Sequence, residues 1–288
     1  RLSTFGTQPV FTSTMGSLPS SLTTNTVNGS LWADDEYNVF YNPSYVNEFK
    51  NMVVLQKGFE GGFFQSIYER MALGAYVNRG GNLLWNRAGV YTAGAQRQYA
   101  PGLIAPGIRE IGGFGDNNYY TGGTNGASIA THAPVDLFIA SDWGVKWGLH
   151  YSHAESPSYK AGTEKNARYS HLDAGMQLFG FEPFLGMTFS SKISYTRPDL
   201  GISNQGTQSL DEFNIGTRFR YENWSPYFVY KRTVMSGVPI ANAVMGAPRE
   251  ISTRMHIVGF GLGHTNELIP GTTTFIKHLG VYSCSVRD

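Results

Sequence analysis

Residues 143–153 read Trp-Gly-Val-Lys-Trp-Gly-Leu-His-Tyr-Ser-His, and this stretch decides the expected class of fold. Large apolar residues alternate in it with small, polar or charged ones. Because a β-strand sends successive side chains to opposite faces, one face of the segment is aromatic and aliphatic and the other is polar. Aromatic residues stand at both ends of the apolar face. This pattern is typical of a strand that crosses a membrane between two interfaces.

The same alternation recurs along the second half of the chain, most clearly in 169–179, 181–195 and 210–221. Weaker alternation of apolar and polar residues predicts further strands before and after these segments. We therefore predict an all-β fold, a transmembrane antiparallel β-barrel of about 10–12 strands. The ten strands that can be counted directly are 52–57, 70–78, 135–140, 143–153, 169–179, 181–195, 210–221, 227–233, 252–263 and 272–285.

Composition agrees with this class of fold. The chain has 288 residues with 35 Gly, 18 Phe, 17 Tyr and 5 Trp, which suits many strands, tight turns and aromatic girdles. Charged residues make up 15%, below the roughly 25% of an average soluble domain. The net charge of +1 offers no broad basic field to nucleic acid, and the single cysteine excludes an intrachain disulfide. No apolar run is long enough to predict a membrane-spanning helix.

We expect two regions. Residues 1–50 are rich in Ser, Thr and Asn and form an N-terminal segment with a short helix before Pro43, while 51–288 form the barrel. Residues 79–134 have no sustained period and are predicted to be a long loop.

The lengths of the connections also point to a barrel. Connections near Ser141, Gly180 and Asn223 are tight, whereas those at 154–167, 196–209 and 234–250 are long. Bacterial outer-membrane barrels have short periplasmic turns and long external loops. Counting strand directions back from residue 135 places residue 51 at the long-loop end. Residues 1–50 would then either cross the lumen as a plug or contain a further strand.

Strand parity assigns side chains to the two faces. Polar residues that share the inward parity form a predicted lumen network. Two interpretations of this network have equal weight: an electrostatic constriction for solutes or lipid headgroups, or a plugged lumen in which the charges pair with one another. Its members are Lys146, His150, His171, Asp173, Lys192, Glu212, Arg218 and Arg220. Apolar residues of the opposite parity are predicted to face lipid or a partner barrel, namely Trp147, Leu149, Leu185, Met187, Phe189, Ile215 and Phe219.

Candidate catalytic and metal-binding residues are few. His150 and His153 are three apart on a strand, which puts them on opposite faces and disfavours a shared metal ion. His171 and Asp173 are two apart on one face and could form a base and its orienting carboxylate. No hydrolase motif surrounds them, so we favour a polar network and keep an outer-membrane hydrolase as an alternative. We expect no enzyme activity, no cofactor and no metal site.

Two resemblances refine the functional expectation. Residues 40–44, Phe-Tyr-Asn-Pro-Ser, resemble the Asn-Pro-Ala segment near the N-terminus of the long-chain fatty-acid transporters of the outer membrane. That resemblance implies that Asn42 and Pro43 belong to a hatch inside a barrel.

More of the chain resembles the major outer-membrane proteins of Bdellovibrio-type predatory bacteria, in Asp34–Phe49, Met71–Asn78 and Pro134–Tyr151. This resemblance implies a small porin-like barrel in the bacterial outer membrane. It also implies a homo-oligomeric ring of about four to six subunits that encloses membrane lipid, closed symmetry being the usual state of such assemblies. The alternative is a general diffusion porin for small solutes.

Overall fold

The structure, a computed structural model, describes residues 36–56, 60–77, 135–160, 163–196, 205–238, 251–269 and 273–287. Within these ranges the chain is all-β apart from two short 3-10 helices, η2 (Glu36–Phe40) and η3 (Pro43–Asn47). The all-β prediction is confirmed. The described part of the chain contains no helix that is both long and apolar enough to cross a membrane. The predicted loop at 79–134 and residues 1–35 lie outside the described ranges.

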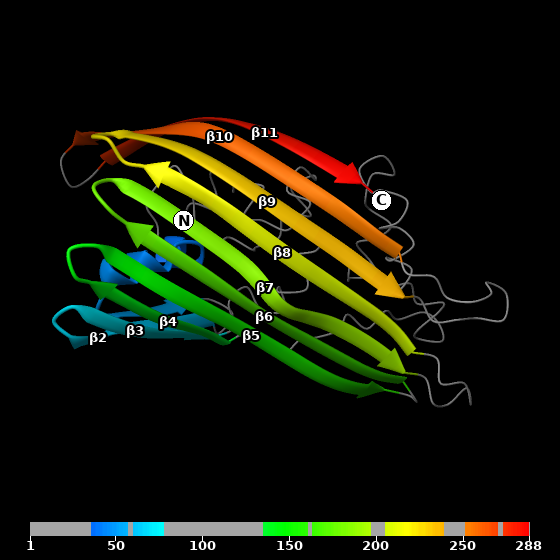
Figure 1. Cartoon of the computed structure of the whole chain (residues 1–288). Helices are drawn as coiled ribbons and strands as arrows, with labels where there is room; N and C mark the ends of the chain where they lie inside the picture. Colours follow the sequence, from blue (N-terminus) through cyan, green and yellow to red (C-terminus); the bar gives the residue numbers. More distant parts are fainter. Residues whose placement is uncertain are drawn as a thin grey trace.

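Within the described ranges eleven strands form one sheet in chain order, and every neighbouring pair is antiparallel (Figure 1). Four short strands come first and seven long ones follow. The short strands are β1 (Met52–Gln56), β2 (Glu60–Tyr68), β3 (Met71–Val77) and β4 (Val135–Asp142). The long strands are β5 (Lys146–Lys160), β6 (Thr163–Gln177), β7 (Phe181–Thr196), β8 (Gln205–Phe219), β9 (Trp224–Val238), β10 (Ile251–Ile269) and β11 (Thr273–Arg287). Among these strands the sheet is not closed, since β1 and β11 are its two edges.

The sequence analysis did not predict one strand, β2. This strand moves residue 51 from the expected end of the sheet to the opposite end. β2 lies between the two segments that were treated as consecutive strands. The extra strand inverts the direction of β1, so Asn51 lies at the end of the sheet that carries the tight turns. Its side-chain oxygen accepts hydrogen bonds there from Gln65 Nε2 at 2.9 Å and from Ser66 N at 3.2 Å.

The tight turns gather at one end of the sheet (Figure 1). They connect β2 to β3, β4 to β5, β6 to β7 and β8 to β9. Four of their residues have positive φ, namely Gly144 at 88°, Phe179 at 49°, Gly180 at 82° and Glu222 at 52°. The opposite end departs from the prediction at 154–167. β5 and β6 continue through that segment and leave only residues 161–162 between them. The sequence prediction missed this because the residues there are mostly polar and show no apolar face that would mark a strand.

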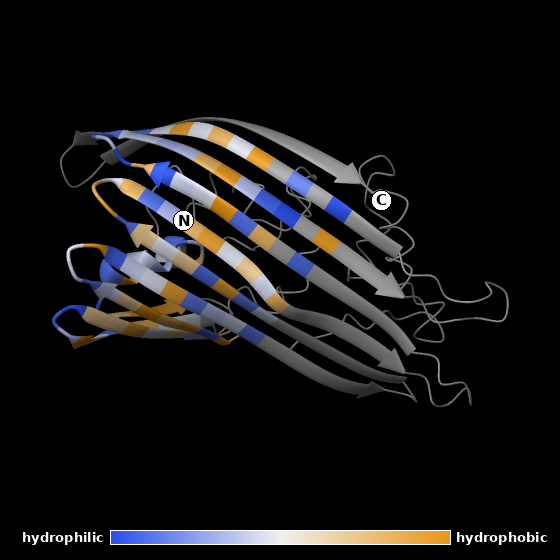
Figure 2. Ribbon diagram, viewed as in Figure 1, coloured by the Kyte–Doolittle hydropathy of each residue, from blue (hydrophilic) through white to orange (hydrophobic). Residues whose placement is uncertain are grey.

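The sheet curves around the two 3-10 helices (Figure 1). We call the face that contacts η2 and η3 the inner face and the opposite one the outer face. Hydropathy alternates along the strands, as Figure 2 shows for β5 to β9. Inner residues such as His150 and Arg218 are buried, whereas their outward neighbours Leu149 and Phe219 are exposed. Apolar side chains therefore lie on the exposed face, and the buried face carries both apolar and charged ones.

A core forms where η2 and η3 meet the inner face. Val39, Phe40, Tyr41, Tyr45 and Val46 are at most 2% exposed. The aromatic rings among them meet aromatic rings of the sheet edge to face, an arrangement that aromatic pairs prefer. These contacts are Phe40 with Tyr76 and Phe138, and Tyr41 with Phe184.

A row of small residues lets η3 approach the sheet closely. Ala72, Ala140, Gly148 and Gly175 are registered partners across β3, β4, β5 and β6, and we call them the small-residue row. A Cβ added at Gly148 would overlap the Pro43 carbonyl, and one at Gly175 would overlap the Asn42 side chain. The absence of side chains there is what allows the N-terminal segment to lie against the wall.

Candidate functional site in the buried polar network

A chain of hydrogen-bonded polar side chains crosses four strands on the inner face. Asp136 Oδ1 lies 2.8 Å from His150 Nε2, and His150 Nδ1 lies 2.9 Å from Asp173 Oδ2. The other Asp173 oxygen lies 3.1 Å from His171 Nε2, and His171 Nδ1 lies 3.2 Å from Thr188 Oγ1. We call these five residues the Asp–His chain. Strand parity puts all five on the inner face, and the register of β4 to β7 places them side by side.

His150 occupies the centre of the Asp–His chain and has no exposed surface. Each ring nitrogen of His150 faces one of the two carboxylates, so both nitrogens have a hydrogen-bond partner. Phe138 stacks on the imidazole at a centroid distance of 4.4 Å, and Phe40 covers it from the N-terminal segment at 5.7 Å. The two rings cover the imidazole, which has no exposed surface, so the side chains around it must satisfy one another's hydrogen bonds.

A second cluster joins the N-terminal segment to the strands beyond. The Tyr45 hydroxyl donates to Glu182 Oε2 at 2.6 Å and accepts from Arg218 and from Arg220 Nη2. Arg218 Nε also donates to Glu182 at 2.7 Å, and Arg220 pairs with the same carboxylate. We call these four residues the tyrosine cluster. The buried Glu182 carboxylate pairs with both guanidinium groups, and the Tyr45 hydroxyl contacts all three.

Asn42 and Pro43 have a local structural role that explains the Asn-Pro-Ser sequence. Asn42 caps η3, since its side-chain oxygen accepts from Ser44 N at 3.3 Å and from Ser44 Oγ at 2.6 Å. Pro43 follows at the first helical position, where a missing N–H costs nothing. The Asn42 amide also donates to the Met176 carbonyl at 3.4 Å, which ties the cap to β6.

Two further contacts hold the end of the segment at the tight turns. Asn47 Nδ2 donates to the Ser141 carbonyl at 3.1 Å, and Lys146 Nζ lies 3.5 Å from Glu48 Oε1. Lys146, predicted to be in the lumen network, thus contacts the N-terminal segment at the mouth of the curved sheet rather than the Asp–His chain.

The structure brings together most of the predicted inward residues. His150, His171 and Asp173 belong to the Asp–His chain, and Arg218 and Arg220 belong to the tyrosine cluster. Lys192 and Glu212 have backbones in β7 and β8, and their side chains lie outside the described part. Glu222, which shares the sequence parity of this set, is exposed in the tight turn before β9.

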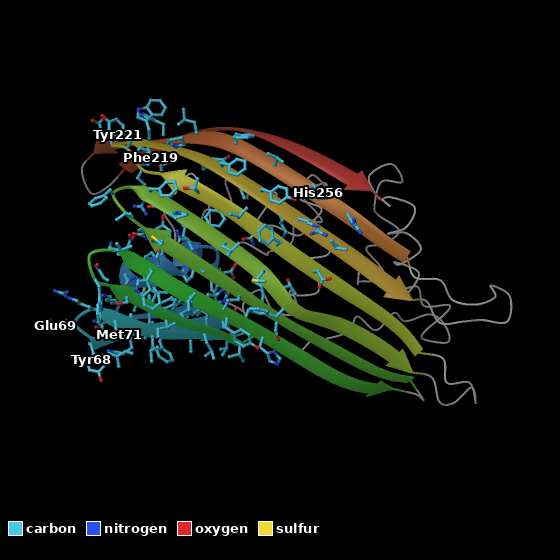
Figure 3. All side chains as sticks on the ribbon, in the orientation of Figure 1. Tyr68, Glu69, Met71, Phe219, Tyr221 and His256 are labelled. Carbon is cyan, nitrogen blue, oxygen red and sulfur yellow. The ribbon has the colours of Figure 1, made fainter. Side chains whose placement is uncertain are left out.

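The seven residues predicted to face outward all lie on the outer face. Trp147, Leu149, Leu185, Met187, Phe189, Ile215 and Phe219 are between 37% and 58% exposed. They belong to a wider set of exposed large apolar residues that runs from β1 to β10. Aromatic residues mark the end with the tight turns, where Figure 3 shows Tyr68 and Tyr221 pointing away from the sheet. We call the whole set of exposed large apolar residues, from β1 to β10, the apolar belt.

His153 lies on the face opposite to His150, as parity predicts. Its Nδ1 is 2.9 Å from Ser170 Oγ, which also accepts from the Tyr151 hydroxyl at 3.3 Å. No group of His, Cys, Asp and Glu residues within the described ranges is arranged to hold a metal ion.

Sequence reasoning missed Asp136, Thr188 and Tyr45. Asp136 carries a readable signal, because it has the same parity as the apolar residues Phe138 and Ala140, which follow it in the strand. Tyr45 carries none, since it lies in a 3-10 helix and its partners are more than a hundred residues away in the chain.

Comparisons with known proteins give no match, whether with protein-family models, curated proteins or solved structures.

Proposed function

We propose that this chain is a non-enzymatic outer-membrane β-barrel protein whose outer face contacts lipid. The observation that supports this most is the inversion of the usual arrangement in soluble proteins. Large apolar side chains occupy the exposed face of the sheet in strand after strand, while charged side chains occupy the buried face. Exposed apolar surface on this scale marks a membrane or protein contact. A β-sheet crosses a bilayer with this alternation.

The inner face favours a closed lumen over an open pore at the end with the tight turns. The N-terminal segment lies across the small-residue row there, and the tyrosine cluster, Asn47 and Glu48 hold it. Its side chains are buried against the wall rather than lining a channel. We therefore prefer a plugged barrel to a general diffusion porin.

A plugged barrel needs a role other than diffusion, and we propose assembly. In this proposal identical copies form a homo-oligomeric ring of about four to six subunits that encloses membrane lipid, closed point-group symmetry being the common arrangement. The resemblance to the outer-membrane proteins of predatory bacteria supports the ring, and the apolar belt supports the contact with lipid. The size of the ring rests on the resemblance alone.

The hydrolase alternative has one observation in its favour, because His171 lies between a carboxylate and the Thr188 hydroxyl. Asp173, His171 and Thr188 therefore stand in the order carboxylate, imidazole, hydroxyl, which is the order of the groups in a catalytic triad. Asp173 is shared with His150, however, and the N-terminal segment covers that histidine, which favours a structural network. Hydrolysis of short and long acyl esters by the wild type and by His171→Ala tests this alternative. Activity that is lost in the variant would establish it.

The membrane orientation is tested by spin labelling. Cys284→Ser provides a background without cysteine, and single cysteines replace Leu185, Met187 and Thr188 for labelling in liposomes. Oxygen dissolved in the bilayer should speed the relaxation of labels at 185 and 187 but not of a label at 188. Equal access of all three to a water-soluble nickel chelate would exclude a lipid-facing outer surface.

Assembly is tested on the same preparation. Native mass spectrometry of the protein released from a mild detergent should show an oligomer that retains phospholipid after detergent exchange. Lipid-free monomers with large steady ion conductance in planar bilayers would instead support the diffusion porin.

A further inference from the structure

An apolar groove indents the outer face near the end with the tight turns. It crosses β5 to β9 and has a volume of about 550 Å³, within the range of roughly 300–1,000 Å³ that is typical of small-molecule sites. Its walls are the exposed side chains of Trp147, Met176, Phe181, Leu185 and Ile215.

The groove exists because small residues interrupt the apolar belt. Ala174 lies between Leu149 and Leu185 in one cross-strand row. In the next row, Pro183 and Thr217 follow Met176. Gly148, Gly175 and Gly216 add bare backbone to the lining. Large apolar side chains therefore surround the groove, and small residues form its floor.

The chemistry of the lining restricts what can occupy the groove. No charged side chain lines it, and the Thr217 hydroxyl is already used, since it donates to the Arg218 carbonyl at 3.3 Å. The indole N–H of Trp147 is the remaining side-chain donor in the lining. An occupant with many polar groups would lose hydrogen bonds to water without replacement, so the groove suits a hydrocarbon.

We propose that this groove binds one acyl chain of a bilayer phospholipid, with the Trp147 indole at the rim nearest the tight turns. The inference rests on the proposed lipid-facing orientation and adds a discrete site to it. Bulk lipid would fill the groove transiently, whereas a chain held by walls on both sides exchanges more slowly. The groove lies within the apolar belt, which the proposed orientation puts in contact with the bilayer, so phospholipid acyl chains are the molecules that surround it. A second copy of the chain is the competing occupant and is an outcome of the test.

The test uses tryptophan fluorescence in liposomes that contain phosphatidylethanolamine with brominated acyl chains, which quench on contact. Trp32, Trp85, Trp143 and Trp224 are replaced by Phe, so that Trp147 alone reports on the groove. A matched reporter carries Leu137→Trp and Trp147→Phe and lies in the apolar belt outside the groove. Trp147 should reach half-maximal quenching at a several-fold lower mole fraction of brominated lipid than Trp at 137.

A groove-filling variant separates the site from the surrounding lipid. Ala174→Leu combined with Thr217→Leu keeps the outer face apolar and removes the space. This variant should raise the half-quenching mole fraction of Trp147 to that of the position 137 reporter. Ala75→Leu, which is outward on β3 and outside the groove, should leave it unchanged.

Each other result overturns the inference in a distinguishable way. Equal quenching of both reporters in the unfilled protein removes the site but keeps the lipid-facing orientation. Quenching at 137 with none at Trp147 assigns the groove to a protein contact between copies. Quenching at neither position contradicts the proposed orientation itself.

Discussion

The Tyr45 hydroxyl donates a hydrogen bond of 2.6 Å to Glu182, a residue 137 positions further along the chain. This bond joins the N-terminal segment to the inner face of β7, and the two guanidinium groups of Arg218 and Arg220 converge on the same hydroxyl. The segment is therefore fixed to charged residues of the wall as well as packed against its aromatic residues.

Tyr45→Phe should destabilise the protein by about 1.5–3 kcal/mol, because it removes a buried hydrogen bond to charged groups and leaves its partners in place. The free energy of unfolding in urea, measured in liposomes, reports the change. Tyr68→Phe is the matched control, since Tyr68 is 72% exposed at the same end of the sheet. If the two variants have equal stability, the hydroxyl does not hold the segment.

Gly175→Val should displace the N-terminal segment, because a Cβ at this position overlaps Asn42. Overpacking of this kind destabilises by about 1–3 kcal/mol, and release of the segment should also raise the single-channel conductance in planar bilayers. Ala174→Val places the same side chain on the opposite face of the same strand and should leave conductance unchanged. A folded Gly175→Val protein with unaltered conductance would show that the segment does not limit the opening.

His150→Leu should destabilise by about 3–5 kcal/mol, since it leaves two buried carboxylates without their shared donor. Adding Asp136→Asn and Asp173→Asn to the same variant should restore part of the loss by removing the uncompensated charges. Unfolding in urea measures both, and His153→Leu on the outer face is the control. Additive effects of the three substitutions would argue against a coupled chain.

Ile215→Arg should destabilise more than Phe219→Arg, although both residues are outward on β8 and similarly exposed. An arginine near the bilayer midplane costs about 2–4 kcal/mol, whereas one near an interface costs about 0–1 kcal/mol. Phe219 is the last residue of its strand, beside the tight turn. Unfolding from liposomes measures the difference, and equal costs at the two positions would contradict a bilayer around the apolar belt.

The strands from residue 135 onward could be predicted because one of their faces is apolar and the other is polar or small. The same rule failed for β2, where two adjacent phenylalanines break the alternation. Phe63 faces outward and Phe64 packs into the core around η2 and η3, so both faces are apolar where the N-terminal segment covers the sheet. A strand with apolar side chains on both faces loses the alternation of apolar and polar residues that identifies it.

The polar site was predictable only in part. Parity placed His150, His171 and Asp173 on one face, and registration of neighbouring strands then brought them together. The partners of Tyr45 depend on the path of the N-terminal segment across the sheet, which no local pattern encodes.

The odd number of described strands has a consequence for how copies can meet. With eleven antiparallel strands, the edge strands β1 and β11 run in the same direction. Direct pairing of the two edges would be parallel and could use only the five residues of β1. In the proposed assembly, copies inserted with one orientation would also present edges that run the same way, so any pairing of their sheets through these two strands would be parallel.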